Sequence, residues 1–448
     1  MIENDTIVAL STPQGEGALG IIRLSGPESL AIAAKHLVAK PPFEARYANF
    51  DRFVIDGDVL DEVVWTWFKA PASYTGENIV EIAFHGSRYI VSQALNALCQ
   101  SGARLAKPGE FTQRAFLNGK LDLSQAEAVA DLIAAESEAE HRLAINQMRG
   151  GFSREINKLR QQLMDFVSLL ELELDFGEED VTFANRDQLM NLVDQSLNFI
   201  KSLISTFRYG NAIKGGIPVA ILGAPNAGKS TLLNALVNDE RAIVSEIAGT
   251  TRDTIEDETI IKGIRFRFID TAGLRDTADV IEAEGVKRSL ALVQKASIVL
   301  YLIDISAPPD EELNRVNDIR NGLEGHQTLL LVANKADLND NSAEWADITI
   351  SAKHGKNMDA LCEKLAKAVE QLKANSADIA VTNARHHQAL TLAAAALEQA
   401  RLDIEQNLPG ELASSDVREA IHHLGSITGE ITPDDILGNI FGKFCIGK

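Results

Sequence analysis

The segment Gly223-Ala-Pro-Asn-Ala-Gly-Lys-Ser230 constrains the fold of this chain more than any other part of its sequence. Its glycines, lysine and serine have the spacing of the phosphate-binding loop GxxxxGK[ST]. An apolar run over residues 217–222 precedes the loop, and a helical pattern over residues 231–237 follows it. This strand–loop–helix order predicts a site where backbone N–H groups and a helix N-terminus hold phosphate. The alternative is an ordinary glycine-rich turn.

Further motifs follow in the order expected of a GTPase. Lys229 is predicted to reach the β- and γ-phosphates, and the Ser230 hydroxyl to ligate Mg²⁺. Residues 266–273 read as a strand ending in DTAG, where Asp270 can hold Mg²⁺ through water and the Gly273 N–H can meet the γ-phosphate. Upstream, Thr251 can give the metal a second hydroxyl. A segment that is ordered only by the γ-phosphate acts as a switch.

Base recognition is predicted downstream. The apolar run 328–333 leads into Asn334-Lys-Ala-Asp337, and a second strand ends in Ser351-Ala-Lys353. The Asp337 carboxylate can accept both guanine N1–H and N2–H, a donor pair that adenine lacks. We therefore predict a GTP-binding domain over residues 214–371. Its predicted nucleotide contacts are Asn226, Ala227, Gly228, Lys229, Ser230, Thr231, Ser245, Glu246, Ile247, Ala248, Gly249, Thr250, Thr251, Asp270, Thr271, Ala272, Gly273, Asn334, Lys335, Ala336, Asp337, Ser351, Ala352 and Lys353.

The sequence departs from Ras-like GTPases at two places. Leu274 stands where those enzymes have a water-orienting Gln, and Leu cannot orient water. Glu282, in an acidic stretch, is the candidate replacement, and the alternative is a solvated switch carboxylate. No arginine finger can be singled out in cis. The Asn226 oxygen could instead hold a monovalent cation, together with backbone carbonyls from Ser245 to Thr250, and so neutralise phosphate charge.

Composition limits the class of protein. The chain has 448 residues, 45% of them hydrophobic, and a net charge of −21, which disfavours unaided binding to nucleic acid. Its apolar runs are too short to cross a bilayer, so we expect no membrane association. Three scattered cysteines without metal-ligand spacing suggest a reducing, cytoplasmic setting. The position of Cys445 suits a prenylation box, but the glycine and lysine that follow it argue against one.

The pattern of elements indicates how the chain is organised. Strand-like runs at 6–10, 19–24 and 79–82 and a helical pattern over 88–98 suggest an α/β segment up to about residue 119. Helices dominate from residue 121, where Ser124 and Glu127 are predicted to form a capping box. Before the GTP-binding domain, apolar residues from Ile156 to Leu174 are predicted to form a stripe along one helix face. After the domain, residues 390–404 are predicted to form a second, narrow and alanine-rich stripe. We expect the flanking helices to pack together, with the GTP-binding domain inserted between them.

Longer motifs now point to a family. The chain resembles the bacterial tRNA modification GTPase family MnmE, also called TrmE, along its whole length. The resemblance rests on GAPNAGKS, AGTTRD, DTAGLR and NKAD, on PGEFTQRAFLNGKLDLSQAEA at residues 108–128, and on FCIGK at residues 444–448. It implies α/β plus α architecture: an N-terminal α/β tetrahydrofolate-binding and dimerisation domain at 1–119, a helical domain at 120–213 and 372–448, and an inserted Ras-like P-loop GTPase domain at 214–371, with a mostly parallel sheet and helices on both faces.

The same resemblance implies activity and ligands. It implies a homodimer whose G domains meet when K⁺ is bound, with Glu282 positioning the attacking water. Asn226, Ser245, Ile247 and Thr250 match the family's K⁺ site, and Ser230 and Thr251 its Mg²⁺ site. The family pattern has Thr at position 245, but only backbone is expected to be used there. Arg23, Glu81, Lys120 and Lys448 match contacts to 5-formyl- or 5,10-methylene-tetrahydrofolate.

The resemblance also implies partners. With the FAD protein MnmG (GidA), in a heterotetramer, the family adds an aminomethyl or carboxymethylaminomethyl group to C5 of the wobble uridine of certain tRNAs. The acidic charge of this chain implies that a basic partner or a small local patch makes much of the contact with tRNA phosphates, and we expect tRNA to be bound through the complex. Read without the family, Arg23 and Glu81 are a surface cation and a strand carboxylate. The alternative function is a GTPase switch that assists ribosome assembly, although no basic KH-type module follows the GTP-binding domain.

Overall fold

The computed structural model describes residues 5–175, 186–237, 257–269, 292–306, 308–325, 327–338, 343–372, 380–431, 434–442, 444 and 446–447. Contacts divide the chain into a first unit, Met1–Ala130 with Met148–Asn157 and Gly425–Lys448, and a second unit, Asp131–Gln147 with Lys158–Leu424. Within the described residues, no helix is both long and apolar enough to span a bilayer.

The first unit is built on a largely antiparallel sheet. Its strand order is β3-β4-β5-β2-β1-β6, and β6 pairs in parallel with β1. The apolar sides of helices α1 and α2 and of the strands form its core, in which Trp65, Phe53 and Phe84 are fully buried. The strands and helices are β1 (Ile7–Leu10), β2 (Gly17–Ser25), α1 (Ser29–Ala34), β3 (Ala48–Ile55), β4 (Asp58–Phe68), β5 (Ile79–Gly86), α2 (Arg88–Gln100) and β6 (Arg104–Leu105).

Short helices complete the first unit. They are α3 (Glu110–Leu117), the start of α4 (Leu123–Ala134) and α15 (Asp434–Phe441). Leu123, Phe441 and Phe444 form a small core with their neighbours. Gly109 has φ +67°, and a Cβ there would lie 2.5 Å from the Phe441 carbonyl oxygen, so only glycine allows α15 to approach α3 this closely.

The cap of α4 differs from the prediction. The Gln125 N–H donates to Asp122 Oδ1, and the Asp122 N–H donates to Gln125 Oε1, so these residues form the capping box. The predicted pair, Ser124 and Glu127, is wrong, because both residues lie inside the helix and are buried. The Ser124 hydroxyl instead shares a 2.7 Å hydrogen bond with Ser153 of α6.

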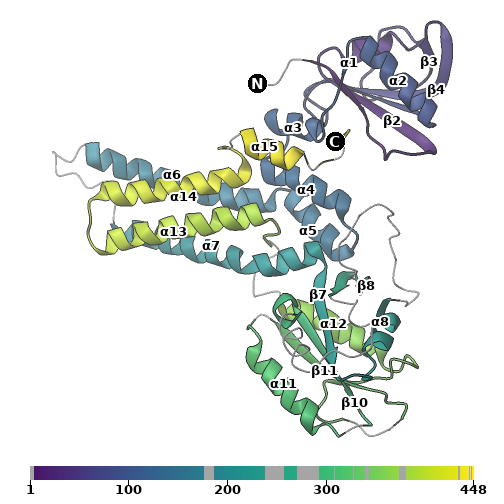
Figure 1. Ribbon diagram of the computed structural model, residues 1–448. Coiled ribbons are helices and arrows are strands. Elements are labelled where there is room, and N and C mark those ends of the chain that lie inside the picture. Colours follow the sequence, from purple (N-terminus) through teal and green to yellow (C-terminus); the bar gives the residue numbers. More distant parts are fainter. Residues whose placement is uncertain are drawn as a thin grey trace. The chain divides into compact units, whose positions relative to one another are not determined.

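The second unit contains the helical bundle shown in Figure 1. The helices α7 and α13 pack along each other. Val193 and Leu197 of α7 and Leu390, Ala393 and Leu397 of α13 are buried. These helices lie on either side of the GTP-binding domain in sequence, so their packing confirms the predicted insertion. The helices are α5 (Glu138–Met148), α6 (Gly151–Asp175), α7 (Arg186–Gly215), α13 (Ala384–Glu405) and α14 (Gly410–Thr428).

The inserted domain is a doubly wound α/β fold, as predicted. Its strand order is β12-β11-β10-β7-β9-β8, parallel except for the β8–β9 pair. One face of the sheet packs against α8 and α12, and the other against α11. The elements are β7 (Ile217–Gly223), α8 (Lys229–Val237), β8 (Asp257–Ile261), β9 (Ile264–Phe268), β10 (Ile298–Asp304), α11 (Asp310–Gly322), β11 (Thr328–Asn334), β12 (Ile348–Thr349) and α12 (Met358–Leu372).

Candidate functional site

The phosphate-binding motif forms the turn between β7 and α8. Gly223 has φ +141°, and a Cβ there would lie 2.2 Å from the Leu302 carbonyl oxygen on the neighbouring strand β10. Gly228 has φ +99°, and a Cβ there would lie 2.2 Å from Asn334 Nδ2. Both positions therefore require glycine, for close approach as well as for backbone conformation. Asn226 has φ +63° and is exposed on this loop.

Lys229 is the first residue of α8 and folds back over the loop. Its Nζ donates to the carbonyl oxygens of Gly223 at 2.9 Å and Ala224 at 2.8 Å. Burial lowers the pKa of this amine. The ammonium group is thus held at the point where a phosphate bound to the α8 N-terminus would meet it. Ser230, next in the helix, is half-buried.

Asn334 ties the predicted nucleotide motifs together. Its side-chain Nδ2 donates to the Ala227 carbonyl at 2.8 Å, and its Oδ1 accepts from the Ala352 N–H at 3.1 Å. Asn334 is 2% exposed. A single amide at the end of β11 therefore fixes the phosphate loop and the segment after β12, which are far apart in sequence, against each other.

Asp337 is oriented by its neighbours. The Ser351 hydroxyl donates to its Oδ1 at 2.5 Å, and His354 Nε2 lies 3.6 Å from its Oδ2. The Ser351 hydrogen bond is the largest cause that holds the pKa of Asp337 below its usual value. The carboxylate is ionised at neutral pH and able to accept two N–H groups from one base edge. Lys335, at φ +66°, pairs with Asp304 at 2.6 Å.

Other predicted nucleotide and metal residues lie outside the described part of the chain. They are Ser245, Glu246, Ile247, Ala248, Gly249, Thr250, Thr251, Asp270, Thr271, Ala272, Gly273 and Glu282. Of the predicted K⁺ ligands only Asn226 is described, and of the Mg²⁺ ligands only Ser230. Within the described residues, no group of three or more His, Cys, Asp or Glu side chains is placed to hold a metal ion.

In the first unit, the structure brings Arg23 and Glu81 together. They face each other on β2 and β5, and Arg23 Nη2 lies 2.7 Å from Glu81 Oε1. The Arg23 guanidinium also stacks over Tyr74 and Phe111, 5.5 and 5.7 Å from their ring centroids. The paired charges and aromatic faces can recognise a planar ring with an amide-like edge. Tyr74 and Phe111 were not predicted, because the contact joins positions far apart in sequence.

Of the other two predicted folate contacts, Lys120 lies in the described part of the chain. Lys120 Nζ donates to the Pro71 carbonyl at 2.9 Å, so this side chain contacts the loop that includes Tyr74. A Cβ on Gly447 would lie 2.1 Å from the Leu10 carbonyl oxygen, so the C-terminal segment packs against the end of β1, the neighbour of β2. Lys448 lies outside the described residues.

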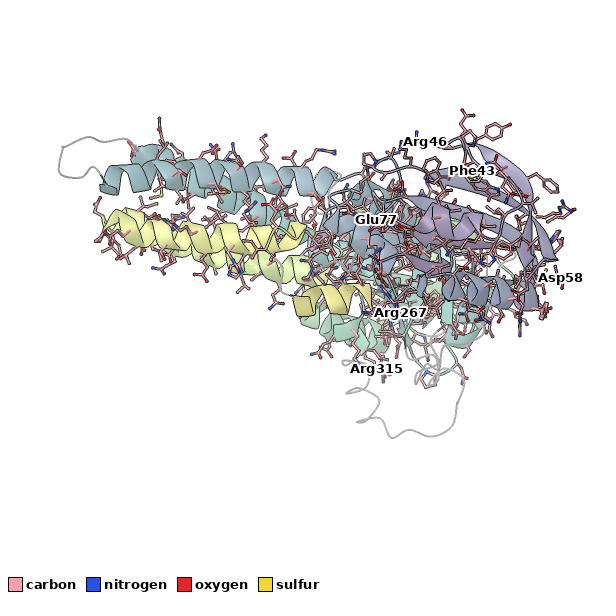
Figure 2. All side chains as sticks on the ribbon, turned by 90° about the horizontal axis from the view of Figure 1, so that it is seen from above. Phe43, Arg46, Asp58, Glu77, Arg267 and Arg315 are labelled. Carbon is pink, nitrogen blue, oxygen red and sulfur yellow. The ribbon has the colours of Figure 1, made fainter. Side chains whose placement is uncertain are left out.

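An ionic network centred on the buried Arg114 supports the same loop and α3. The Arg114 guanidinium contacts Asp5 at 2.5 Å, Glu110 at 3.2 Å and Glu77 (labelled in Figure 2) at 3.2 Å. Arg104 pairs with both Asp5 and Glu110 at 2.7 Å. These pairs lie beside Tyr74, whose hydroxyl bonds Thr112 of α3 at 2.9 Å. Part of the long motif at 108–128 thus has a structural role that the sequence did not reveal.

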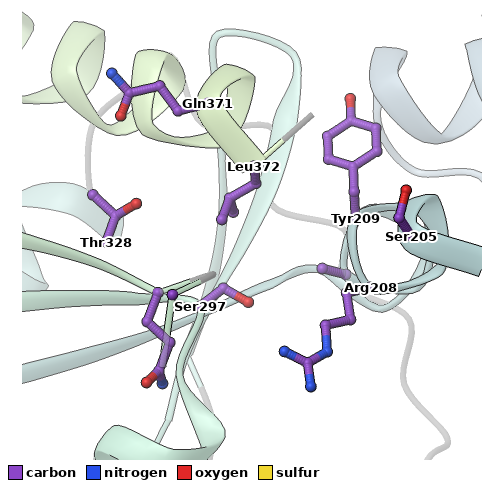
Figure 3. A pocket seen from close by; sticks show the side chains of 10 residues that line it. Ser205, Arg208, Tyr209, Ser297, Thr328, Gln371 and Leu372 are labelled. Atoms are coloured by element: carbon purple, nitrogen blue, oxygen red, sulfur yellow. The ribbon is translucent and has the colours of Figure 1, made fainter. Parts of the chain in front are cut away.

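A cleft of about 370 Å³ lies elsewhere in the second unit (Figure 3). It is lined by Ser205 and Tyr209 of α7 and by Gln371 near the end of α12. Ser297, just before β10, and Thr328, the first residue of β11, also line it. The phosphate loop and Asp337 follow the carboxyl ends of the parallel strands, so the cleft lies at the opposite end of the sheet. It is not the nucleotide site.

Comparison with known proteins gives consistent results. Residues 6–120 match the family described as GTP-binding protein TrmE N-terminus, and residues 123–445 match the MnmE helical domain family. The chain is 50% identical to the tRNA modification GTPase MnmE of Cytophaga hutchinsonii over 455 residues, covering 99% of this chain and 98% of the relative. It is 49% identical to the protein of that name from Christiangramia forsetii, covering 99% of each chain, and 47% identical to that from Bacteroides fragilis, covering 100% of each.

Proposed function

This chain belongs to the MnmE family of tRNA modification GTPases, and from that premise we propose that it hydrolyses GTP to drive modification of tRNA. The main structural support for GTP hydrolysis is the Asn334 side-chain amide, which joins the phosphate loop to the segment after β12. That contact brings the predicted phosphate-binding loop and the predicted base-recognition segment together at one end of the sheet. The role in tRNA modification is supported by the names of the relatives reported above.

The described residues support binding of the nucleotide. The turn at Gly223 and Gly228 directs backbone N–H groups toward phosphate oxygens, and α8 adds its positive N-terminal end. The Lys229 ammonium exchanges its carbonyl contacts for phosphate oxygens, which are better partners for a half-buried cation. The Ser230 hydroxyl would ligate Mg²⁺, which would neutralise phosphate charge when bound.

Guanine selection rests on Asp337. Ser351 occupies Oδ1 as a donor and leaves other lone pairs of the carboxylate free for guanine N1–H and N2–H. Adenine would present a lone pair at N1, which the ionised carboxylate repels. This supports GTP rather than ATP as the nucleotide.

We further propose that hydrolysis depends on K⁺ and on meeting of the G domains in a homodimer. Asn226, which is exposed on the loop and has a positive φ, would hold the ion with carbonyls from Ser245, Ile247 and Thr250. Glu282 positions the attacking water. The motivation is the missing Gln after DTAG and the absence of a recognisable arginine finger in the sequence.

The Arg23–Glu81 pair supports a pterin-type ligand. The carboxylate of Glu81 can accept ring N–H groups, while Arg23 and the Tyr74 face provide cation and stacking contacts. We propose that formyl- or methylene-tetrahydrofolate binds here, with Lys120 and Lys448 near its acidic part. The one-carbon unit would go to C5 of the wobble uridine together with MnmG, which brings FAD and contributes to tRNA binding.

Nucleoside mass spectrometry of tRNA from cells lacking this protein tests the proposal. We expect loss of the C5 side chain on the wobble uridine, restored by the wild-type chain and not by a Lys229→Ala chain. Unchanged nucleosides together with abnormal ribosomal particles would instead favour a ribosome-assembly GTPase.

A further inference from the structure

The hairpin formed by β8 and β9 lies between the predicted switch segments. β8 begins shortly after Thr251, and β9 ends two residues before Asp270. β9 pairs in parallel with β7, which leads into the phosphate loop, and β8 is the edge strand of the sheet. Both predicted switch segments are therefore joined along the chain to this edge hairpin.

The turn of this hairpin completes the first turn of α5. The Ala139 N–H donates to the Gly263 carbonyl at 3.0 Å. The Ser137 hydroxyl accepts from the Glu140 N–H at 3.3 Å, and Glu140 Oε2 accepts from the Glu136 N–H at 2.7 Å. N–H groups at the start of a helix have no partner within it, so the hairpin carbonyl stabilises this helix end.

Arg265 on β9 makes the charged part of the contact. Its Nη1 lies 2.8 Å from Glu136 Oε2, and its Nε forms an ion pair at 2.8 Å with Glu140 Oε1. Its Nη2 donates to the Lys214 carbonyl at 3.1 Å, at the end of α7. The Arg265 side chain is 15% exposed and that of Glu140 6%, so water screens this pair little.

The surroundings make this contact directional. Apolar side chains of α5, Ala139 and Leu143, pack against the core of the G domain but fix no orientation. A cavity of about 280 Å³ borders Arg265, lined in part by Asp131 and Lys214. The hydrogen bonds from Arg265 Nη1 to Glu136 and from Nη2 to the Lys214 carbonyl have defined geometry and orient the hairpin on the segment before α5 and on α7. The Nε of Arg265 faces Glu140 as a charge partner without an aligned hydrogen bond.

We propose that Arg265 is a positioning residue for the GTPase cycle, which passes nucleotide-dependent movement of the β8–β9 hairpin to α5 and α7. The proposal rests on the GTPase function proposed above. Arg265 stands five residues before Asp270, roughly 16 Å along an extended strand. Its planar guanidinium contacts Glu136 and Glu140 on the helical side, Glu258 at 3.5 Å on β8 and the Lys214 carbonyl, a set of contacts that a lysine cannot match.

Hydrogen exchange of the full-length chain tests the proposal, with GDP and with a non-hydrolysable GTP analogue. In the wild type, peptides covering 136–144 should exchange differently in the two states, while peptides covering 223–231 are protected by either nucleotide. In Arg265→Met, the nucleotide-dependent difference at 136–144 should disappear, and protection at 223–231 should remain. Arg265→Lys should retain part of the difference. The control is Arg315→Met, which removes an exposed arginine from α11 and should behave as wild type.

The outcomes separate this proposal from the function it rests on. No protection at 223–231 in the wild type would overturn nucleotide binding itself. Protection there without a nucleotide-dependent difference at 136–144, or a wild-type difference in Arg265→Met, would overturn the role of Arg265. A merely structural role would raise exchange equally in both states and leave the difference intact. If Arg265→Met does not fold, Glu140→Gln is the second variant. It keeps the acceptor for the Glu136 N–H but loses the charge, and should also lose the nucleotide-dependent difference at 136–144. An unchanged difference in this variant would refute the proposal.

Discussion

Asn334→Ala is the sharpest test of the nucleotide site. The change removes one donor and one acceptor and leaves the Ala227 carbonyl and the Ala352 N–H without their partner. Ala227 is 1% exposed and Ala352 6%, so water cannot freely replace the lost contacts. An unsatisfied buried polar group costs about 1–3 kcal/mol, and two of them cost about 2–6 kcal/mol.

The loss has two measurable parts. A loss of about 2 kcal/mol in the free energy of unfolding should lower the midpoint temperature of thermal unfolding of the G domain by about 4–8 °C. We expect GDP affinity to fall at least about tenfold, because the loop and the segment after β12 are no longer held in register. Calorimetry measures both, by scanning and by titration. The matched control is Asn317→Ala on the exposed face of α11, which should change neither by more than about 0.5 kcal/mol. If Asn334→Ala keeps the GDP affinity and the unfolding temperature of the wild type, Asn334 does not hold the two segments together as inferred.

Three further predictions follow from the site. Glu282→Ala should bind GTP normally and lower the single-turnover rate constant of hydrolysis by about 10²–10⁴, and a wild-type rate constant would move the water-positioning role elsewhere. Burial lowers the pKa of Lys229 and a bound phosphate raises it, so nucleotide binding at alkaline pH should take up protons, and GDP affinity should fall as pH rises through the lowered pKa. Calorimetry in buffers of different ionisation enthalpy measures this uptake, and its absence would contradict the assignment. Arg23→Gln should weaken binding of 5-formyl-tetrahydrofolate at least about tenfold in a fluorescence titration, whereas the exposed Arg52→Gln should not; equal affinities would exclude the Arg23 site.

The local part of the fold could be predicted from the sequence. The run 217–222 and the pattern 231–237 correspond to β7 and α8, because a phosphate loop, its strand and its helix are neighbours along the chain. The β3–β4 hairpin was missed, although Asp56-Gly57 is a hairpin signal and both residues have positive φ. The helix cap was assigned to Ser124 and not to Asp122, since the sequence does not show that Ser153 of another helix takes the serine hydroxyl.

The long-range part of the site could not be predicted in this way. Arg23 and Glu81 meet through strand pairing, and Tyr74 joins them from a loop whose position depends on the buried Arg114 network. The role of Asn334 as a link between loops also depends on tertiary packing. Motif spacing indicates which residue types a nucleotide needs, but not which side chains hold them in place.

The rate of GTP hydrolysis by the full-length chain in K⁺ and in Na⁺, measured over a range of protein concentrations, tests the central claim most directly. The account predicts turnover at least about tenfold faster in K⁺, with a rate per chain that rises as the G domains pair. Equal rates in the two salts, independent of protein concentration, would contradict it.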